Sequence, residues 1–400
     1  MWEQIRSNRI RSAVLVIGMG ALLFLIGYFL GLYFFDNALA GLILAVALWI
    51  IMTLVGFFQG DNILLASAGA KKISHDDHPR LYNIVEEMRI ASGLPKTPDI
   101  YIIDDPSLNA FATGRDPNKA AVAITSGLLQ HLNRDELQGV MAHEIAHIKN
   151  KDVLLMAMSS ILLGTIVMLS WYGSRIMIFG GGSGSRRDSS SGGAAQGIIM
   201  ILALLLMILA PIFAQLIYFA ISRKREYLAD ASAAMYTRYP EGLASALEKL
   251  GASTGQLKSA NKATAPMYIV NPFREKGRAA NDLSSTHPPI SDRIRILRAM
   301  GGGASFVDYE KAYKQVHKGK GSVMPASAMS LAGSSQSVPI RAPAVDDPDR
   351  LERTRETSGL MWKLNNYNTI DCSCGTKLRI PPQFHQKSVR CPHCGEVHSV

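Results

Sequence analysis

The stretch NRDELQGVMAHEIAHIKNKD, residues 133–152, determines how the rest of the chain is interpreted. Within it, His143 and His147 are four positions apart, so that on a helix both imidazoles lie on one face and can bind one zinc ion. Glu144 lies beside them and can reach a water held by the metal. We therefore predict a metal-binding helix in which Glu144 acts as the general base.

The helix is predicted independently of the metal ligands. Asn133, followed three residues later by Glu136, is typical of a helix N-terminus. An apolar stripe follows at helical spacing and leaves the two histidines together on another face; its members are Leu137, Met141, Ile145 and Ile148.

A third ligand is expected, because catalytic zinc usually has three protein ligands and one open position. In the sequence REYLAD, residues 225–230, Glu226 and Asp230 are four positions apart and share a helical face. Glu226 could bind the zinc while Asp230 accepts a hydrogen bond from a ligand histidine. A solvated cluster of charges explains the same residues equally well.

Four windows contain no Asp, Glu, Lys or Arg, and each reaches the length of about 20 residues that a membrane-spanning helix needs. They are residues 13–35, 37–60, 153–174 and 197–221. Arg6, Arg9 and Arg11 precede the first window, which places the N-terminus in the cytoplasm by the positive-inside tendency. Residues 61–152 and 223–400 would then be cytoplasmic too, although the outer loop, 175–196, has more basic than acidic residues.

A signal peptide is the competing interpretation of residues 1–40, because Ala38 to Ala40 resembles a cleavage site. The first uncharged window is longer than the apolar core of about 7 to 15 residues that a signal peptide has. We therefore expect a retained transmembrane helix.

The chain resembles, block by block, the HtpX-type membrane metalloproteases, which are relatives of the CAAX prenyl endopeptidase. The resemblance covers roughly residues 1–300, and its blocks are NAFATGR (109–115), AAVAITSGLL (120–129), AHEIAHIKNKD (142–152), REYLAD (225–230), NPF (271–273) and STHPP (285–289). It implies a zinc endopeptidase in which Glu226 is the third zinc ligand and Asp230 is the acid that supports a ligand histidine. It also implies an active site on the cytoplasmic side of the membrane and a role in quality control of misfolded or damaged membrane proteins.

Three further residues are candidates on the strength of this resemblance. His287 and Arg293 fall in a segment that approaches the active site in the family, and one of them is expected to stabilise the oxyanion. A turn residue before two prolines is the alternative for His287. Asn109 belongs to a substrate-side loop, and its amide could bridge peptide N–H and C=O groups.

Two short β-rich runs, residues 100–103 and 121–125, precede the metal helix. An exposed edge of such a strand could pair with an extended peptide backbone, and ordinary sheet packing is the alternative.

The four cysteines lie close together near the C-terminus and form two pairs with the spacing of a zinc ribbon: Cys372, Cys374, Cys391 and Cys394. His385 and His393 could substitute if one cysteine failed to bind. Disulfides are not expected in a reducing cytoplasm. We expect this unit to bind a protein partner or substrate, because its basic excess is too small to indicate nucleic acid.

These features predict a mainly α polytopic membrane protein with four transmembrane helices, a cytoplasmic zincin-like α+β catalytic domain and a small C-terminal zinc ribbon. It would hold one catalytic and one structural zinc, act on membrane-protein or unfolded-protein substrates, and reside in the cytoplasmic (inner) membrane with both termini in the cytoplasm. The expected parts are 1–60 (two spans), 61–152 (catalytic), 153–222 (two spans with a flexible outer loop), 223–316 (catalytic), 317–360 (flexible linker) and 361–400 (ribbon).

Two other functions share this sequence pattern. A proteolytically silent membrane adaptor would keep the fold and bind partners through its ribbon, but the chain retains Glu144 and every expected ligand. A prenyl-protein processing protease would use the same chemistry, and only its substrates would differ.

Overall fold

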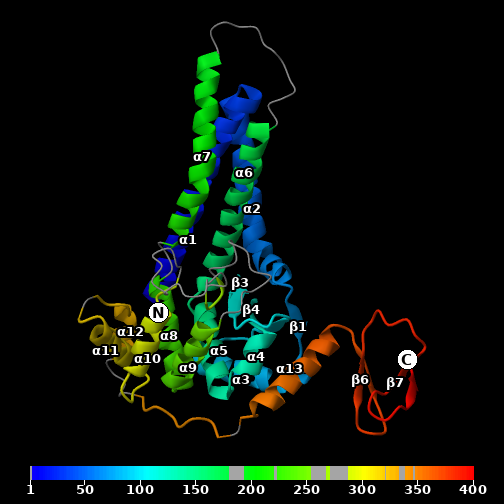
Figure 1. Ribbon diagram of the computed structural model, residues 1–400. Helices are drawn as coiled ribbons and strands as arrows, with labels where there is room; N and C mark the ends of the chain where they lie inside the picture. The colour runs from blue at the N-terminus through cyan, green and yellow to red at the C-terminus, as the bar shows by residue number, and fades with distance from the viewer. Residues whose placement is uncertain are drawn as a thin grey trace.

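The computed structural model of the 400-residue chain describes residues 2–179, 193–219, 223–253, 267–270, 287–319, 321–332, 338–345 and 347–400. Four long helices stand together at one end of the molecule (Figure 1), namely α1 (Trp2–Phe35), α2 (Ala38–Ser67), α6 (Asp152–Phe179) and α7 (Gly193–Phe219). Each includes a stretch long and apolar enough to cross a bilayer: Val16–Phe35, Ala38–Ser67, Asp152–Ile176 and Gly197–Gln215. The four predicted membrane helices are therefore confirmed. The outer loop predicted to be flexible, residues 180–192, lies outside the described residues.

Glycines set the close packing of α1 against α2. A methyl group placed on Gly41 would lie 2.0 Å from the carbonyl oxygen of Gly27 and 2.5 Å from the Cα of Gly31. Small residues of this kind let two membrane helices approach backbone to backbone. Asn37 caps the start of α2 by accepting hydrogen bonds from two backbone N–H groups.

A four-stranded sheet lies directly beyond the membrane helices, with strand order β1-β2-β4-β3. The strands are β1 (Lys71–Ile73), β2 (Asp99–Ile103), β3 (Ala110–Gly114) and β4 (Ala120–Thr125). β2 and β4 pair in parallel, and the two outer pairs are antiparallel. The two β-rich runs predicted from the sequence are thus β2 and β4, which are inner strands. The expectation that one of them offers a free edge is wrong, and the alternative of ordinary sheet packing holds, because β1 and β3 flank them and form the two edges.

The metal-binding helix is α5 (Arg134–Lys149), and it begins with the predicted capping box between Asn133 and Glu136. It packs among α3 (Pro79–Ser92), α8 (Arg223–Thr237) and α9 (Pro240–Ala252). Gly139 allows α9 to come close, since a methyl group there would lie 2.7 Å from the backbone nitrogen of Leu243. The short η1 (His75–Asp77) and α4 (Ser126–His131) flank α3 and β4.

The two faces of the sheet are buried by different partners. Ala110 and Ala112 of β3 join the main core around α5, whereas Phe111 belongs to a second cluster on the opposite face. That second cluster includes Leu64 from the end of α2 and Met156 from the start of α6. The alternation of strand side chains therefore joins the catalytic helix to the membrane helices through one sheet.

The segment expected to be a flexible linker, residues 317–360, contains ordered helices. After α10 (Ile290–Arg298) and α11 (Phe306–Val316), the chain forms α12 (Ala326–Ala332) and α13 (Arg350–Leu364). α13 packs against α4, and its buried Arg353 pairs with Asp347 at 2.7 Å. Arg341, in the segment before α13, pairs with Asp135 of α5 at 2.6 Å. Much of this segment is therefore bound to the catalytic part, because Asp347 also pairs with Arg80 of α3 and Arg341 pairs with Asp135 of α5.

The C-terminal unit follows α13 as two small hairpins at one side of the molecule (Figure 1). β5 (Asn368–Asp371) pairs with β6 (Lys377–Ile380), and β7 (Ser388–Arg390) pairs with β8 (Val397–Ser399). Arg379 of β6 stacks over the ring of Trp362 in α13, 4.5 Å from its centroid, and so links the hairpins to that helix.

Candidate active site

Three predicted ligands meet between α5 and α8. The Nε2 atoms of His143 and His147 are 3.2 Å apart, and each lies 3.5 Å from a carboxylate oxygen of Glu226. All three side chains are buried. The structure thus brings together the two histidines of one helix and a glutamate more than seventy residues later in the sequence. Their ligand atoms all lie within 4.8 Å of one another, so the three residues could hold a metal ion.

The spacing of these atoms fits zinc. Ligands at about 2.0 to 2.1 Å from a tetrahedral ion are separated by about 3.3 to 3.4 Å, close to the distances between these three residues. Glu226 Oε2 is buried, and its nearest charged partners, His143, His287 and Arg293, lie 3.5 to 3.7 Å away. Burial lowers the pKa of His143, but hydrogen bonds to Asp230 and Glu226 raise it to about 9 overall. The pocket therefore favours positive charge, which a zinc ion supplies in place of the proton.

A carboxylate lies behind each histidine. His143 Nδ1 is 2.9 Å from Asp230 Oδ1, and His147 Nδ1 is 3.0 Å from Asp152 Oδ2. An N–H donated from Nδ1 to a carboxylate fixes the ring and leaves the Nε2 lone pair for the metal. Asp230 therefore occupies the supporting position predicted for it.

Asp152 contacts a candidate metal ligand although the sequence pattern did not predict it; it is the last residue of the block 142–152. It is the first residue of α6, and Lys151 before it has a positive φ of 59°. This left-handed residue turns the chain sharply between α5 and α6 and returns Asp152 to His147. Helical spacing cannot reveal the contact, because the helix ends before Asp152.

We expect Asp152→Asn to weaken zinc binding by about 10- to 100-fold, because an amide orients the His147 ring less firmly than a carboxylate. Competition with a chromophoric chelator measures the change. Asp116→Asn is the matched control, since Asp116 is partly exposed and contacts only a neighbouring arginine among the ion pairs of the described residues. Equal affinities for the wild type and Asp152→Asn would refute the assignment.

Arg293 of α10 lies behind Asp230 and is fully buried. Its Nε and Nη2 donate to the two oxygens of Asp230 at 2.8 and 2.7 Å, and its Nη1 is 3.7 Å from Glu226 Oε2. Such a bidentate pair fixes both partners. The guanidinium is thus committed to the carboxylates that hold the metal ligands, which makes Arg293 a positioning residue.

His287 reaches the site from the turn before α10, and its Nε2 lies 3.7 Å from Glu226 Oε2. Burial lowers the pKa of His287 to about 4, in spite of the opposing charge of Glu226. A neutral imidazole can still donate one hydrogen bond. Of the two predicted oxyanion donors, His287 therefore has the geometry that remains compatible with that role.

Glu144 lies on α5 between the two ligand histidines and faces β3. Burial raises its pKa above the ordinary value, while the positive charges of His143 and His147 oppose this shift. The backbone N–H of Ala112 in β3 also opposes the rise in the pKa of Glu144. The candidate base thus lies between the metal ligands and the edge strand.

Asn109 lies immediately before β3 and is buried. Its Oδ1 accepts from the backbone N–H of Ala110, and its Nδ2 donates to the carbonyl of Val270 at 3.0 Å. The amide therefore contacts the chain's own backbone along the strand edge, and its contact with a substrate stays a prediction.

The four cysteines also converge, and all are free thiols. Cys372 Sγ lies 3.3 Å from Cys394 Sγ, and Cys374 Sγ lies 3.7 Å from Cys391 Sγ. Four thiolates at such spacing fit one zinc ion. Of the two histidines that the sequence suggested as substitutes, His393 is a hydrogen-bond partner of Cys374. Glu396 and His398 form a second possible ligand group with Cys372.

The sequence of this chain is similar to those of known proteins. The family model described as Peptidase family M48 matches residues 75–301. A "Protease HtpX homolog" of Dictyoglomus turgidum is 45% identical over 309 residues, which cover 77% of this chain and 98% of that protein. One from Streptococcus pyogenes serotype M28 is 43% identical over 300 residues, 75% of this chain and 100% of that protein. Among solved structures, S. mikatae Ste24p matches 74% of this chain and 67% of its own at 22% identity with a TM-score of 0.40.

Proposed function

Since this chain belongs to peptidase family M48 and is a membrane metalloprotease similar to HtpX proteases, we propose that it is a zinc-dependent endopeptidase that cleaves misfolded or damaged membrane proteins at the cytoplasmic face of the membrane. The observation that carries the proposal is the buried set His143, His147 and Glu226, with Glu144 beside it.

The distance of this set from the membrane helices supports a substrate at the membrane surface. His147 lies five residues before the start of α6, which at about 1.5 Å per residue is within about 10 Å. Glu226 lies in the first turn of α8, which starts four residues after α7 ends. A polypeptide segment emerging from the bilayer can therefore reach the site without complete extraction.

We assign the steps of peptide-bond hydrolysis to individual residues. When bound, zinc supplies an activated water near neutral pH and polarises the peptide carbonyl. Glu144 takes the proton from the attacking water and returns it to the leaving amine. His287 donates a hydrogen bond to the carbonyl oxygen as negative charge develops on it. Asp230, Asp152 and Arg293 keep the ligands oriented, and Asn109 holds the substrate backbone.

The test uses the full chain purified in detergent. A chelator should abolish cleavage of an unfolded fluorescent polypeptide, and added zinc should restore it. In a second assay the protein is reconstituted into proteoliposomes. There the same polypeptide attached to a transmembrane helix should be cleaved faster than the free polypeptide. Cleavage that persists in the metal-free protein would exclude the proposed chemistry.

The cytoplasmic side is proposed from the basic residues that precede the apolar stretch of α1, Val16–Phe35. All four cysteines of the chain lie in the C-terminal unit, so a membrane-impermeant thiol reagent reports the side of that unit. After chelation, the reagent should label inside-out vesicles and leave right-side-out vesicles unlabelled. The reverse pattern would place the site outside the cell.

The C-terminal unit is proposed to recruit substrates or a protein partner. Because α13 packs on the catalytic part, deletion should start after it, at residue 366, to keep that helix. We expect deletion of 366–400 to leave kcat/KM for a short peptide within about twofold and to lower cleavage of the helix-tethered polypeptide several-fold. Equal losses for both substrates would show that the unit only stabilises the enzyme.

A further inference from the structure

The outer edge of β3 is occupied by a distant part of the same chain, residues 267–270. The backbone N–H of Ile269 donates to the carbonyl of Ala110 at 3.0 Å. On either side of this bond, Asn109 Nδ2 donates to the carbonyl of Val270, and Arg293 Nη1 lies 3.5 Å from the carbonyl of Ile269. The segment is therefore held through its main-chain groups.

Main-chain contacts of this kind do not depend on the side chains of the bound segment. Any extended peptide offers the same N–H and C=O groups, which is how peptides add to an exposed strand edge. The edge continues from Ala110 to Ala112, whose N–H meets the Glu144 carboxylate. A backbone lying where 267–270 lies is thus next to the candidate base and beside the metal ligands.

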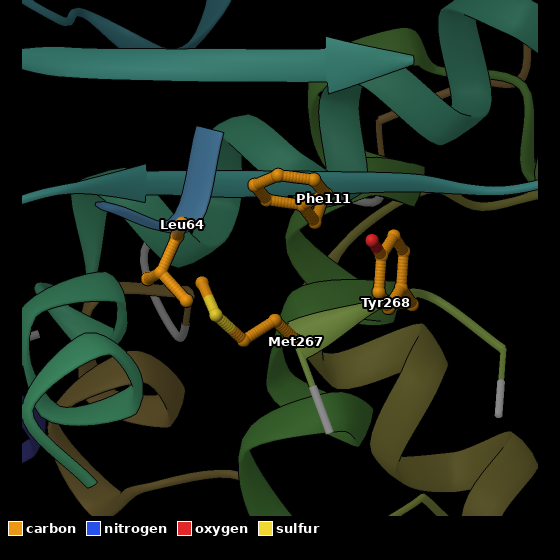
Figure 2. Close-up of a pocket in the computed structure, with 4 residues that line it drawn as sticks. All are labelled: Leu64, Phe111, Met267 and Tyr268. Atoms are coloured by element: carbon orange, nitrogen blue, oxygen red, sulfur yellow. The ribbon is translucent and has the colours of Figure 1, made fainter. Parts of the chain in front are cut away.

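The Tyr268 side chain anchors the segment against the edge strand. The Tyr268 ring packs edge to face against Phe111, with centroids 5.1 Å apart, and Tyr268 is almost fully buried. Figure 2 shows Tyr268 and Phe111 at one side of a pocket and Leu64 and Met267 at the other. Phe111 comes from the edge strand and Leu64 from the membrane helix α2. The pocket is apolar and lies where the sheet meets the membrane helices.

We propose that residues 267–270 are an internal occupant of the peptide-binding edge, and that a substrate replaces them with its own backbone and places a large apolar side chain against Phe111, where the Tyr268 ring now lies. The inference rests on the proposed function and deepens it. Phe111 and Leu64 then determine specificity, and the occupant lowers the apparent affinity for peptides. A substrate rich in aromatic residues, as membrane segments are near the interface, competes best with it.

The test measures binding separately from catalysis. Zinc-loaded, full-length Glu144→Gln protein is titrated against two fluorescent peptides, Gly-Met-Tyr-Ile-Val-Gly and the same peptide with Ala in place of Tyr, and anisotropy is recorded. The Tyr peptide should bind more tightly. Because an aromatic pair contributes roughly 0.5 to 1.5 kcal/mol, equivalent to about twofold to tenfold in affinity, adding Phe111→Ala should reduce the preference by that factor.

Removing the internal anchor should have the opposite effect on both peptides. With Tyr268→Ser, both should bind at least about twofold more tightly, since the competitor has lost its aromatic contact. In the active enzyme the same change should lower KM and leave kcat unchanged. Ile90→Ser, which removes an exposed apolar side chain from α3, is the matched control and should alter neither value.

The outcomes separate this proposal from the proposed function. Unchanged or weaker peptide binding by a Tyr268→Ser protein of normal melting temperature and zinc content would show that 267–270 is a permanent part of the fold, even if the enzyme is active. Absence of cleavage by the zinc-loaded wild type would contradict the proposed function. The anisotropy results would still show whether a peptide replaces residues 267–270 at the edge of β3.

Discussion

Glu144→Gln is expected to reduce kcat for peptide cleavage by about 10²- to 10⁴-fold, the range by which a positioned acid–base group contributes to catalysis. The amide has nearly the same shape as the carboxylate but cannot take a proton from water. Zinc content should remain that of the wild type, because Glu144 is absent from the His143, His147 and Glu226 set. Rates are measured with a quenched fluorescent peptide and zinc by elemental analysis.

The comparison with Glu226→Gln makes this prediction specific. That variant changes the buried carboxylate between the two imidazoles, so it should lose zinc and activity together. If Glu144→Gln lost zinc as well, its effect on rate would not identify a base. If it kept more than a tenth of the wild-type kcat, another group would have to move the proton.

Arg293→Met is expected to cost about 3 to 5 kcal/mol of stability, the usual penalty when one partner of a buried ion pair is removed. Both Arg293 and Asp230 are fully buried, and the guanidinium contacts both oxygens of the carboxylate. Without it, Asp230 remains as a buried anion that only the His143 ring still contacts among the ion pairs of the described residues. The melting temperature of the zinc-free protein in detergent should therefore fall steeply.

Two further variants separate the ion pair from general damage to α10. Arg298→Met removes an arginine from the same helix, but Arg298 is exposed and pairs with exposed Glu241 and Glu248. Its cost should be about 0 to 1 kcal/mol. The double variant Asp230→Asn with Arg293→Met should recover part of the lost stability, because it no longer buries a lone charge. A double variant less stable than Arg293→Met alone would contradict this account.

Much of the site was predictable because its signals are local. The His143 and His147 pair, the cap at Asn133 and the apolar stripe all repeat at the helical period, and α5 has the predicted start. The uncharged windows likewise depend only on length and composition, and the structure has a membrane-length helix at each. The choice of Glu226 over a solvated charge needed the family resemblance in addition, since two acids on one helical face fit either interpretation.

The remaining parts could not be predicted because they depend on contacts between distant segments. β2 and β4 carry the strongest strand pattern, yet the strand order places them inside the sheet and leaves β1 and β3 at its edges. The supposed linker is rich in small residues and proline, but Asp347 pairs with Arg80 of α3 and Arg341 pairs with Asp135 of α5. Composition alone does not contain those partners.

The sequence by itself determined the four membrane helices, the metal-binding helix and the cysteine pairs, because each depends on residues within one or two turns or one short spacing. Only the tertiary structure decided that Asp152 orients His147, that Arg293 holds Asp230, and that residues 267–270 lie along β3. These contacts result from one chain turn and from the packing of α8, α10 and the sheet around α5. Burial then makes each of them strong, since a charge or N–H group removed from water must find its partner within the fold.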